Sequence, residues 1–119
     1  MRKIEQQMVD AIKQGKSFSL ANTRVTHRKK TDTGTASGVY LHNNLICVVH
    51  WNEVRKGLTS RDYSVESIDC TLAGWPTVTT RSRLNAICRG LGMVCRFGQR
   101  KGRQYFDDQE IDSTDWVTL

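Results

Sequence analysis

The stretch GVYLHNNLICVVHW, residues 38–51, constrains the fold more than any other part of the sequence. Two runs rich in β-branched and aromatic residues flank the pair Asn43-Asn44. Because asparagine tolerates the positive φ angles of a two-residue primed turn, the stretch predicts a β-hairpin. We expect this hairpin to form the centre of an antiparallel sheet.

A third strand is predicted over residues 63–72, YSVESIDCTL, where apolar and polar residues alternate. The alternation slips once, between Val65 and Ile68, which indicates a β-bulge. We interpret residues 53–62 as a basic, polar connection and residues 29–38 as a loop, because the loop is rich in Thr, Ser, Gly and charge.

Two helices are predicted from apolar residues at helical spacing. The first covers residues 2–14 and stops at Gly15, and the second is short, residues 81–89, with glycines after it. Their apolar stripes are Ile4, Met8, Ala11 and Ile12 in the first helix and Leu84, Ile87, Cys88 and Leu91 in the second.

With a mixed strand at 18–26 and a closing hairpin at 93–106, these elements predict an α+β fold. We expect an antiparallel sheet of five or six strands with both helices on one face. The 119 residues fit a single domain, 1–119, that ends in an acidic segment, 107–119. The apolar runs are too short to cross a bilayer and the opening residues lack the apolar region of a secretory signal, so we expect a cytoplasmic protein.

Four cysteines occur in apolar surroundings and without the paired spacing of a zinc site. A buried free thiol behaves as a small hydrophobic side chain, so we expect free, structural thiols and no bound metal or cofactor. The residues are Cys47, Cys70, Cys88 and Cys95.

Charge is distributed unevenly along the chain, which has 18 basic and 12 acidic residues. Five of the acids lie in residues 107–119, so the preceding 106 residues hold all 18 basic residues and only seven acids. Residues 71–106 contain seven basic residues and no acid. This excess of positive charge predicts a polyanionic partner.

Residues 74–92, GWPTVTTRSRLNAICRGLG, predict a turn, a threonine cluster, a basic helix and a glycine stop. A structural interpretation packs the Trp75 indole on the core, so that Trp75→Ala would cost about 3–5 kcal/mol. It also makes Thr79 or Thr80 the helix N-cap, and Asn85 a tie from the helix to a neighbouring loop. The full structural motif is Gly74, Trp75, Thr79, Thr80, Leu84 and Asn85.

Arg81 and Arg83 lie in the predicted first helical turn, where the helix dipole disfavours cations. With the two threonines and the exposed amides there, they predict a phosphate-binding site. The alternative is a salt bridge from these arginines to the acidic segment.

Two further basic clusters are candidate nucleic-acid contacts. The closing hairpin presents Arg96, Arg100, Lys101 and Arg103, as β-ribbon nucleic-acid binders do, and a second cluster near the start is Arg28, Lys29 and Lys30, preceded by Arg24. Phe97, Tyr105 and Phe106 interleave with the hairpin cations and either stack on bases or belong to the core. His27, His42 and His50 match no catalytic signature, so we expect no enzymatic activity.

The chain resembles a family of small, uncharacterised proteins of tailed bacteriophages in three places. These are the set Phe18, Asn22-Thr23 and Val25, the segment VYLHNNLI (residues 39–46) and the segment GWPTVTTRSRLNAI (residues 74–87). The likeness covers roughly residues 18–105, and it departs at Asn43, where relatives usually have glycine. The resemblance implies a phage origin and a shared fold, and it brings no established activity.

Two functions therefore remain as hypotheses. The first is non-enzymatic nucleic-acid binding through the arginine-rich clusters. The second is a host-takeover or anti-defence protein that binds and inhibits a host protein. The acidic segment discriminates between them, because a segment folded over the basic face would block access to phosphates.

Overall fold

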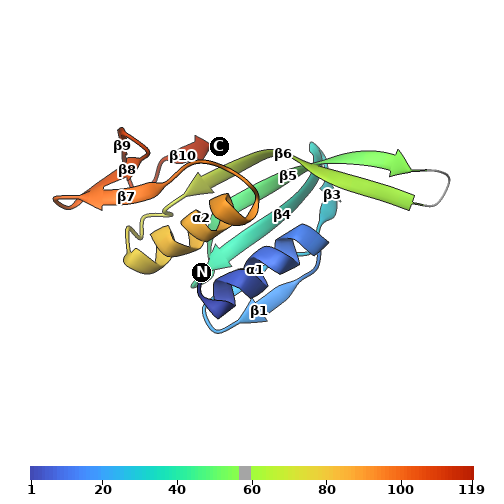
Figure 1. The fold of residues 1–119 in the computed structure, drawn as a ribbon, viewed down its shortest axis with the longest axis horizontal. Coiled ribbons are helices and arrows are strands. Elements are labelled where there is room, and N and C mark those ends of the chain that lie inside the picture. The colour runs from blue at the N-terminus through green and yellow to red at the C-terminus, as the bar shows by residue number, and fades with distance from the viewer. Residues whose placement is uncertain (57–59) are drawn as a thin grey trace.

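The computed structural model describes residues 1–56 and 60–119 and has the predicted α+β architecture (Figure 1). The chain begins with helix α1 (Lys3–Gln14) and carries a second helix, α2 (Val78–Gly90), after the sixth strand. The strands are β1 (Phe18–Leu20), β2 (Thr23–Val25), β3 (Lys29–Thr31), β4 (Gly34–Leu41), β5 (Asn44–Lys56), β6 (Ser60–Thr71), β7 (Phe97–Arg100), β8 (Arg103–Phe106), β9 (Gln109–Ile111) and β10 (Trp116–Thr118).

The main sheet is antiparallel in the order β1-β2-β4-β5-β6-β10, with β3 also paired to β4. In the described residues it has seven strands, and β7-β8-β9 form a second, three-stranded sheet. Figure 1 shows α1 and α2 side by side on one face of the main sheet, as predicted. The acidic segment is not a loose tail, because it supplies β9 to the small sheet and β10 to the main one.

The central hairpin is present, but its turn lies one residue earlier than predicted. His42 and Asn43 occupy the turn with φ angles of 49° and 64°, while Asn44 already pairs with Leu41. Both turn residues therefore have the positive φ of a primed turn. The position of a turn depends on which residues pair across the strands, and the sequence of the turn alone does not define that register.

Two segments predicted as irregular are largely strand. Residues 29–38 contain β3 and the start of β4, because Thr35 pairs with Trp51 and continues the central ladder despite the loop-like composition. Residues 53–62 continue β5 and begin β6, and residues 57–59 lie outside the described part of the chain. The predicted bulge is confirmed, since the register shifts where His50 pairs with Ser67 and Trp51 with Val65.

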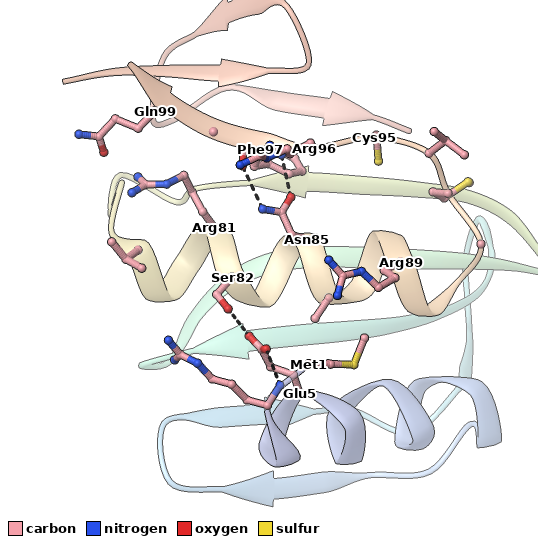
Figure 2. A pocket seen from close by; sticks show the side chains of 17 residues that line it. Met1, Glu5, Arg81, Ser82, Asn85, Arg89, Cys95, Arg96, Phe97 and Gln99 are labelled. Carbon is pink, nitrogen blue, oxygen red and sulfur yellow. Dashed lines mark hydrogen bonds between the residues drawn. The ribbon is translucent and has the colours of Figure 1, made fainter. Parts of the chain in front are cut away.

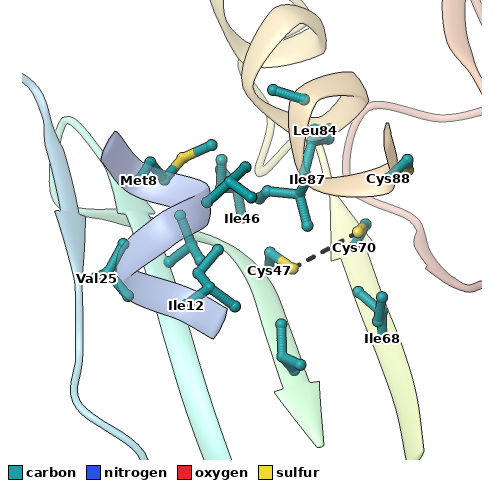
Figure 3. Close-up of a cluster of buried hydrophobic side chains, with 14 of the residues drawn as sticks. Met8, Ile12, Val25, Ile46, Cys47, Ile68, Cys70, Leu84, Ile87 and Cys88 are labelled. Carbon is teal, nitrogen blue, oxygen red and sulfur yellow. Dashed lines mark hydrogen bonds between the residues drawn. The ribbon is translucent and has the colours of Figure 1, made fainter. Parts of the chain in front are cut away.

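The core fills the space between the two helices and the sheet (Figure 3). Ile12 from α1 and Ile87 from α2 are fully buried, as is Ile46 from β5. Gly90 is the last residue of α2, and Leu91 is its C-cap. A Cβ atom at Gly90 would collide with the side chain of Val9 on α1. The glycine therefore allows the two helices to approach closely.

The four cysteines are free, and three of them are buried, in agreement with the prediction of buried thiols. Cys47 and Cys70 are paired across β5 and β6 with their sulfurs 3.8 Å apart. The contact with Cys47, together with burial, raises the pKa of the Cys70 thiol, and burial raises the pKa of Cys88. Protonated thiols are poor nucleophiles and poor metal ligands, so these residues act as packing groups.

Candidate functional site

Helix α2 carries most of the motif that the sequence singles out, and its N-cap is Thr77. The Thr77 Oγ1 accepts a hydrogen bond from the backbone N–H of Thr80 at 3.1 Å, so the prediction of Thr79 or Thr80 as the cap is wrong. Thr80 is instead completely buried in the first turn. Three threonines follow Pro76 closely, and only the start of the helical backbone distinguishes the cap from its neighbours.

Arg83 points into the molecule and is only 4% exposed. Its Nη1 lies 2.9 Å from Oε2 of Glu5 on α1, and its Nε donates to Oγ1 of Thr23 at 3.1 Å. Asn22 adds a longer contact at 3.5 Å. The prediction that Arg83 meets a phosphate is therefore corrected, because its carboxylate partner is inside the fold. That partner comes from α1 and not from the acidic segment.

Glu5 completes this buried network, because it joins both helices. Its Oε2 accepts hydrogen bonds from Oγ of Ser82 at 2.6 Å and from Arg83, and Oε1 accepts one from the backbone N–H of Arg2 at 3.3 Å. Burial alone raises the pKa of a carboxyl group, but these hydrogen bonds and the Arg83 charge outweigh burial and hold the pKa of Glu5 below its usual value. Glu5 is thus an ionised but fully compensated acid.

Asn85 ties α2 to the chain that enters β7, as the structural interpretation predicted. Its Nδ2 donates to the carbonyl oxygen of Phe97 at 2.9 Å, and its Oδ1 accepts from the Phe97 N–H at 2.7 Å (Figure 2). The side chain therefore satisfies both backbone groups of a buried residue. This pair of bonds attaches the segment 92–99 to the helix at Phe97.

An open groove of about 1230 Å³ lies between α2, the N-terminus and residues 92–99 (Figure 2). Four arginines line it: Arg2, Arg81, Arg89 and Arg96. Arg81 is held in place, because its Nη1 donates to the carbonyl oxygen of Pro76 at 3.0 Å and to Oε1 of Gln104 at 2.9 Å. No hydrogen bond or ion pair joins the side chain of Arg89 or Arg96 to any residue that the structure describes.

The acidic segment leaves this groove open. No residue beyond Gln99 lines the groove, and the acid that does line it is Glu5, whose charge is compensated by Arg83. At the β7–β8 turn, Asp108 of this segment is 3.9 Å from Arg100 and Glu110 is 3.5 Å from Arg103. Asp107 lies nearer the groove, where its Oδ1 accepts a hydrogen bond from the backbone N–H of Arg96 at 2.9 Å. The positive charge of the groove is therefore accessible, while that of the turn is partly neutralised.

Trp75 is 60% exposed, so the prediction of a buried indole is wrong. It stands at a second, smaller hollow of about 440 Å³, lined by Leu41, His42, Asn44, Ile46, Leu72, Ala73, Trp75, Thr77, Thr79 and Thr80. The segments VYLHNNLI and GWPTVTT, which residues 47–73 separate in the sequence, thus meet at one surface feature.

The family model described as Kyanoviridae Gp96 protein matches residues 1–118. The chain belongs to this family. The match confirms the resemblance to a tailed-bacteriophage family and extends it over both termini, so that α1 and the acidic segment belong to the Kyanoviridae Gp96 fold. Among curated proteins and among solved structures, no match was found.

The other predicted contact residues do not line the groove. Arg28 is inserted between the rings of Trp51 and Tyr63, each 4.1 Å from its guanidinium carbon, which is a structural cation–π contact. Lys29 and Lys30 are exposed on β3, and Figure 1 places β3 far from the β7–β8 turn with Arg100, Lys101 and Arg103. The basic clusters therefore do not form one continuous surface.

The aromatic residues of the closing hairpin were expected either to stack on bases or to belong to the core, and they differ in this respect. Phe97 is buried and packs edge-to-face on Phe106 with ring centroids 5.1 Å apart, so this pair belongs to the core. Tyr105 is half-buried, and the guanidinium carbon of Arg100 lies 4.9 Å from the centre of its ring.

Neither helix in the described part of the chain has the length or apolar character needed to span a bilayer. The same residues contain no cluster of three or more His, Cys, Asp or Glu side chains suited to a metal ion.

Proposed function

We propose that this phage protein binds single-stranded nucleic acid through the groove between α2 and residues 92–99, in the host cytoplasm and without catalysing a reaction. The observation that carries the proposal is the set of arginines in one groove whose lining acid is already paired inside the fold. Lysine and arginine side chains that meet phosphates release counterions from the nucleic acid, which favours binding.

The dimensions of α2 fit a short stretch of one strand. Arg81 and Arg89 are eight residues apart on the same face of the helix, a distance of about 12 Å along its axis. At about 3.4 Å per nucleotide, this corresponds to roughly three phosphates of a stacked strand. The Asn85 bonds tie the second wall of the groove to the helix, and we infer that a single strand fits between these two walls better than a duplex.

A second candidate is a host protein with an acidic, apolar segment. Val78 and Val94 are exposed at the groove, with Val94 fully solvent-accessible, and exposed apolar side chains beside cations suit a protein partner. We rank this candidate second because four arginines line the groove, whereas its exposed large apolar side chains among the described residues are Met1, Val78 and Val94.

The test is a titration of labelled single-stranded and duplex oligonucleotides of about 12 nucleotides, measured by fluorescence anisotropy at several salt concentrations. The variant Arg89→Gln/Arg96→Gln removes two groove cations whose side chains have no hydrogen bond or ion pair with the described residues. It should weaken binding and lower the slope of log affinity against log salt by about 0.7 for each single-strand phosphate that the variant no longer neutralises.

The matched control is Lys16→Gln/Lys29→Gln, which removes the same charge from two exposed lysines outside the groove. This control should keep the wild-type salt slope if the groove is the binding site. Equal losses of affinity in both variants would show that net charge alone drives binding, and absence of salt-dependent binding by the wild type would overturn the proposal.

A further inference from the structure

The hollow at Trp75 has an apolar interior and a polar rim. Leu41, Ile46 and Leu72 are buried residues of its wall, whereas His42 and Thr77 are exposed at its edge. Its volume of about 440 Å³ lies within the range of about 300–1,000 Å³ that is usual for small-molecule pockets. The combination suits a planar ring that has apolar faces and hydrogen-bonding edges.

Trp75 is held in its exposed position by backbone structure. Ala73 and Gly74 have φ angles of 54° and 77°, and the Gly74 N–H donates to the carbonyl oxygen of Ser113 at 2.9 Å. The Trp75 N–H donates to the carbonyl oxygen of Leu72 at 2.9 Å, and its own carbonyl accepts from the Thr77 N–H at 2.8 Å. These bonds form a tight corner that exposes the Trp75 indole to solvent, although folding favours the burial of so large an apolar side chain.

The hollow and the arginine groove adjoin the same turn of helix α2. Val78 lines the groove, while its neighbours Thr77 and Thr79 line the hollow. Residues one apart on a helix differ by about 100° in direction, so the first turn of α2 separates the two features. Arg81 lines the groove and donates to the carbonyl oxygen of Pro76, the residue after Trp75. A cation that can hold a phosphate therefore lies next to the aromatic corner.

We infer that the hollow captures one unpaired base of the bound strand, stacked on the Trp75 indole, while the neighbouring phosphate meets Arg81. This inference rests on the proposed function and names the part of the ligand that enters the hollow. Bases of single strands stack readily on exposed aromatic side chains, and the exposed His42 at the rim offers a hydrogen-bonding group to the edge of the base.

The test compares Trp75→Ala with Trp116→Ala, because Trp116 is a similarly exposed tryptophan on β10, outside both features. Loss of one stacked base should weaken single-strand binding about 5- to 150-fold in Trp75→Ala and leave Trp116→Ala unchanged. The salt slope of Trp75→Ala should equal that of the wild type, because both proteins neutralise the same phosphates. Trp75→Phe should retain most of the affinity.

A set of oligonucleotides with one abasic site at successive positions identifies the captured base. One position should weaken wild-type binding by about the factor seen in Trp75→Ala, and the same abasic strand should bind Trp75→Ala no more weakly than the intact strand does. Melting curves of each variant show that the fold is retained.

The outcomes separate the inference from the function on which it rests. Salt-dependent binding with equal affinity in the wild type and Trp75→Ala would overturn the base pocket and leave the groove proposal intact. Additive losses of affinity from the abasic site and the tryptophan substitution would also overturn the pocket. A wild type that binds no strand would overturn both.

Discussion

The two sides of helix α2 use arginine in opposite ways. Arg83 on the inner side is buried against Glu5 and Thr23. Arg89 on the outer side lines an open groove and pairs with none of the residues that the structure describes. The residue type is the same and the helix is the same. What differs is the availability of a carboxylate, since a buried cation is tolerated only when an anion and hydrogen bonds compensate its lost hydration.

The comparison separates fold from function within one motif. Arg83 and Asn85 connect α2 to α1, to the β1–β2 turn and to β7, so they assemble the walls of the groove. Arg81 and Arg89 leave their charge at its surface. Substitutions on the inner side should therefore change stability, and substitutions on the outer side should change binding.

The largest expected effect is on Arg83. Arg83→Met leaves the Glu5 carboxylate buried without its counter-ion and should cost about 3–5 kcal/mol of the free energy of unfolding, measured by urea denaturation. Arg89→Met is the matched control and should change stability by less than about 0.5 kcal/mol, because its side chain is exposed.

A double variant sharpens this result. Glu5→Leu/Arg83→Met replaces both ions with apolar side chains and should recover much of the stability that Arg83→Met loses. If the double variant is as unstable as Arg83→Met, the loss of stability comes from packing, and the account of an uncompensated charge is wrong.

An intermediate effect is expected on acidification. The folded-state pKa of Glu5 lies below its usual value, so its stabilising contribution is fully present above the unfolded-state pKa. That contribution is lost as pH falls through the folded-state pKa, below about pH 4.5. Stability measured from about pH 6 down to pH 3 should therefore fall less steeply in Glu5→Gln than in the wild type.

The acid dependence should be reduced in Glu5→Gln and not abolished. Asp69 also has a lowered pKa, because Thr118 donates to it at 2.6 Å and His50 lies 2.9 Å away, which together outweigh the opposing effect of burial. An identical pH dependence in the wild type and Glu5→Gln would mean that the buried ion pair does not contribute to acid denaturation.

The smallest effect on stability is expected at Trp75. Because its indole is largely exposed, Trp75→Ala should change the free energy of unfolding by less than about 1 kcal/mol. Trp51→Ala should cost about 3–5 kcal/mol, since Trp51 is 6% exposed and its Nε1 donates to Oγ of Ser37 at 3.1 Å. Similar melting temperatures for the two variants would contradict this contrast between an exposed and a buried tryptophan.

Local patterns predicted the elements of this protein where one face of an element is buried. The alternation in residues 63–72 gave the strand and its bulge, and the stripe through Met8 and Ile12 gave helix α1. The excess of basic residues between 71 and 106 also pointed to the part of the chain that supplies three of the four arginines lining the groove. These features are readable because periodicity and charge are properties of neighbouring residues.

The tertiary structure decided which of those residues face solvent. Glu5 and Arg83 are 78 positions apart, so no local pattern shows that this arginine is neutralised while Arg89 is not. Trp75 is exposed because of a corner fixed by Ser113, a residue of the C-terminal segment. Composition and periodicity determined an α+β fold with a basic half, and only the long-range contacts determined which cations remain free, because burial depends on partners that the chain brings together after folding.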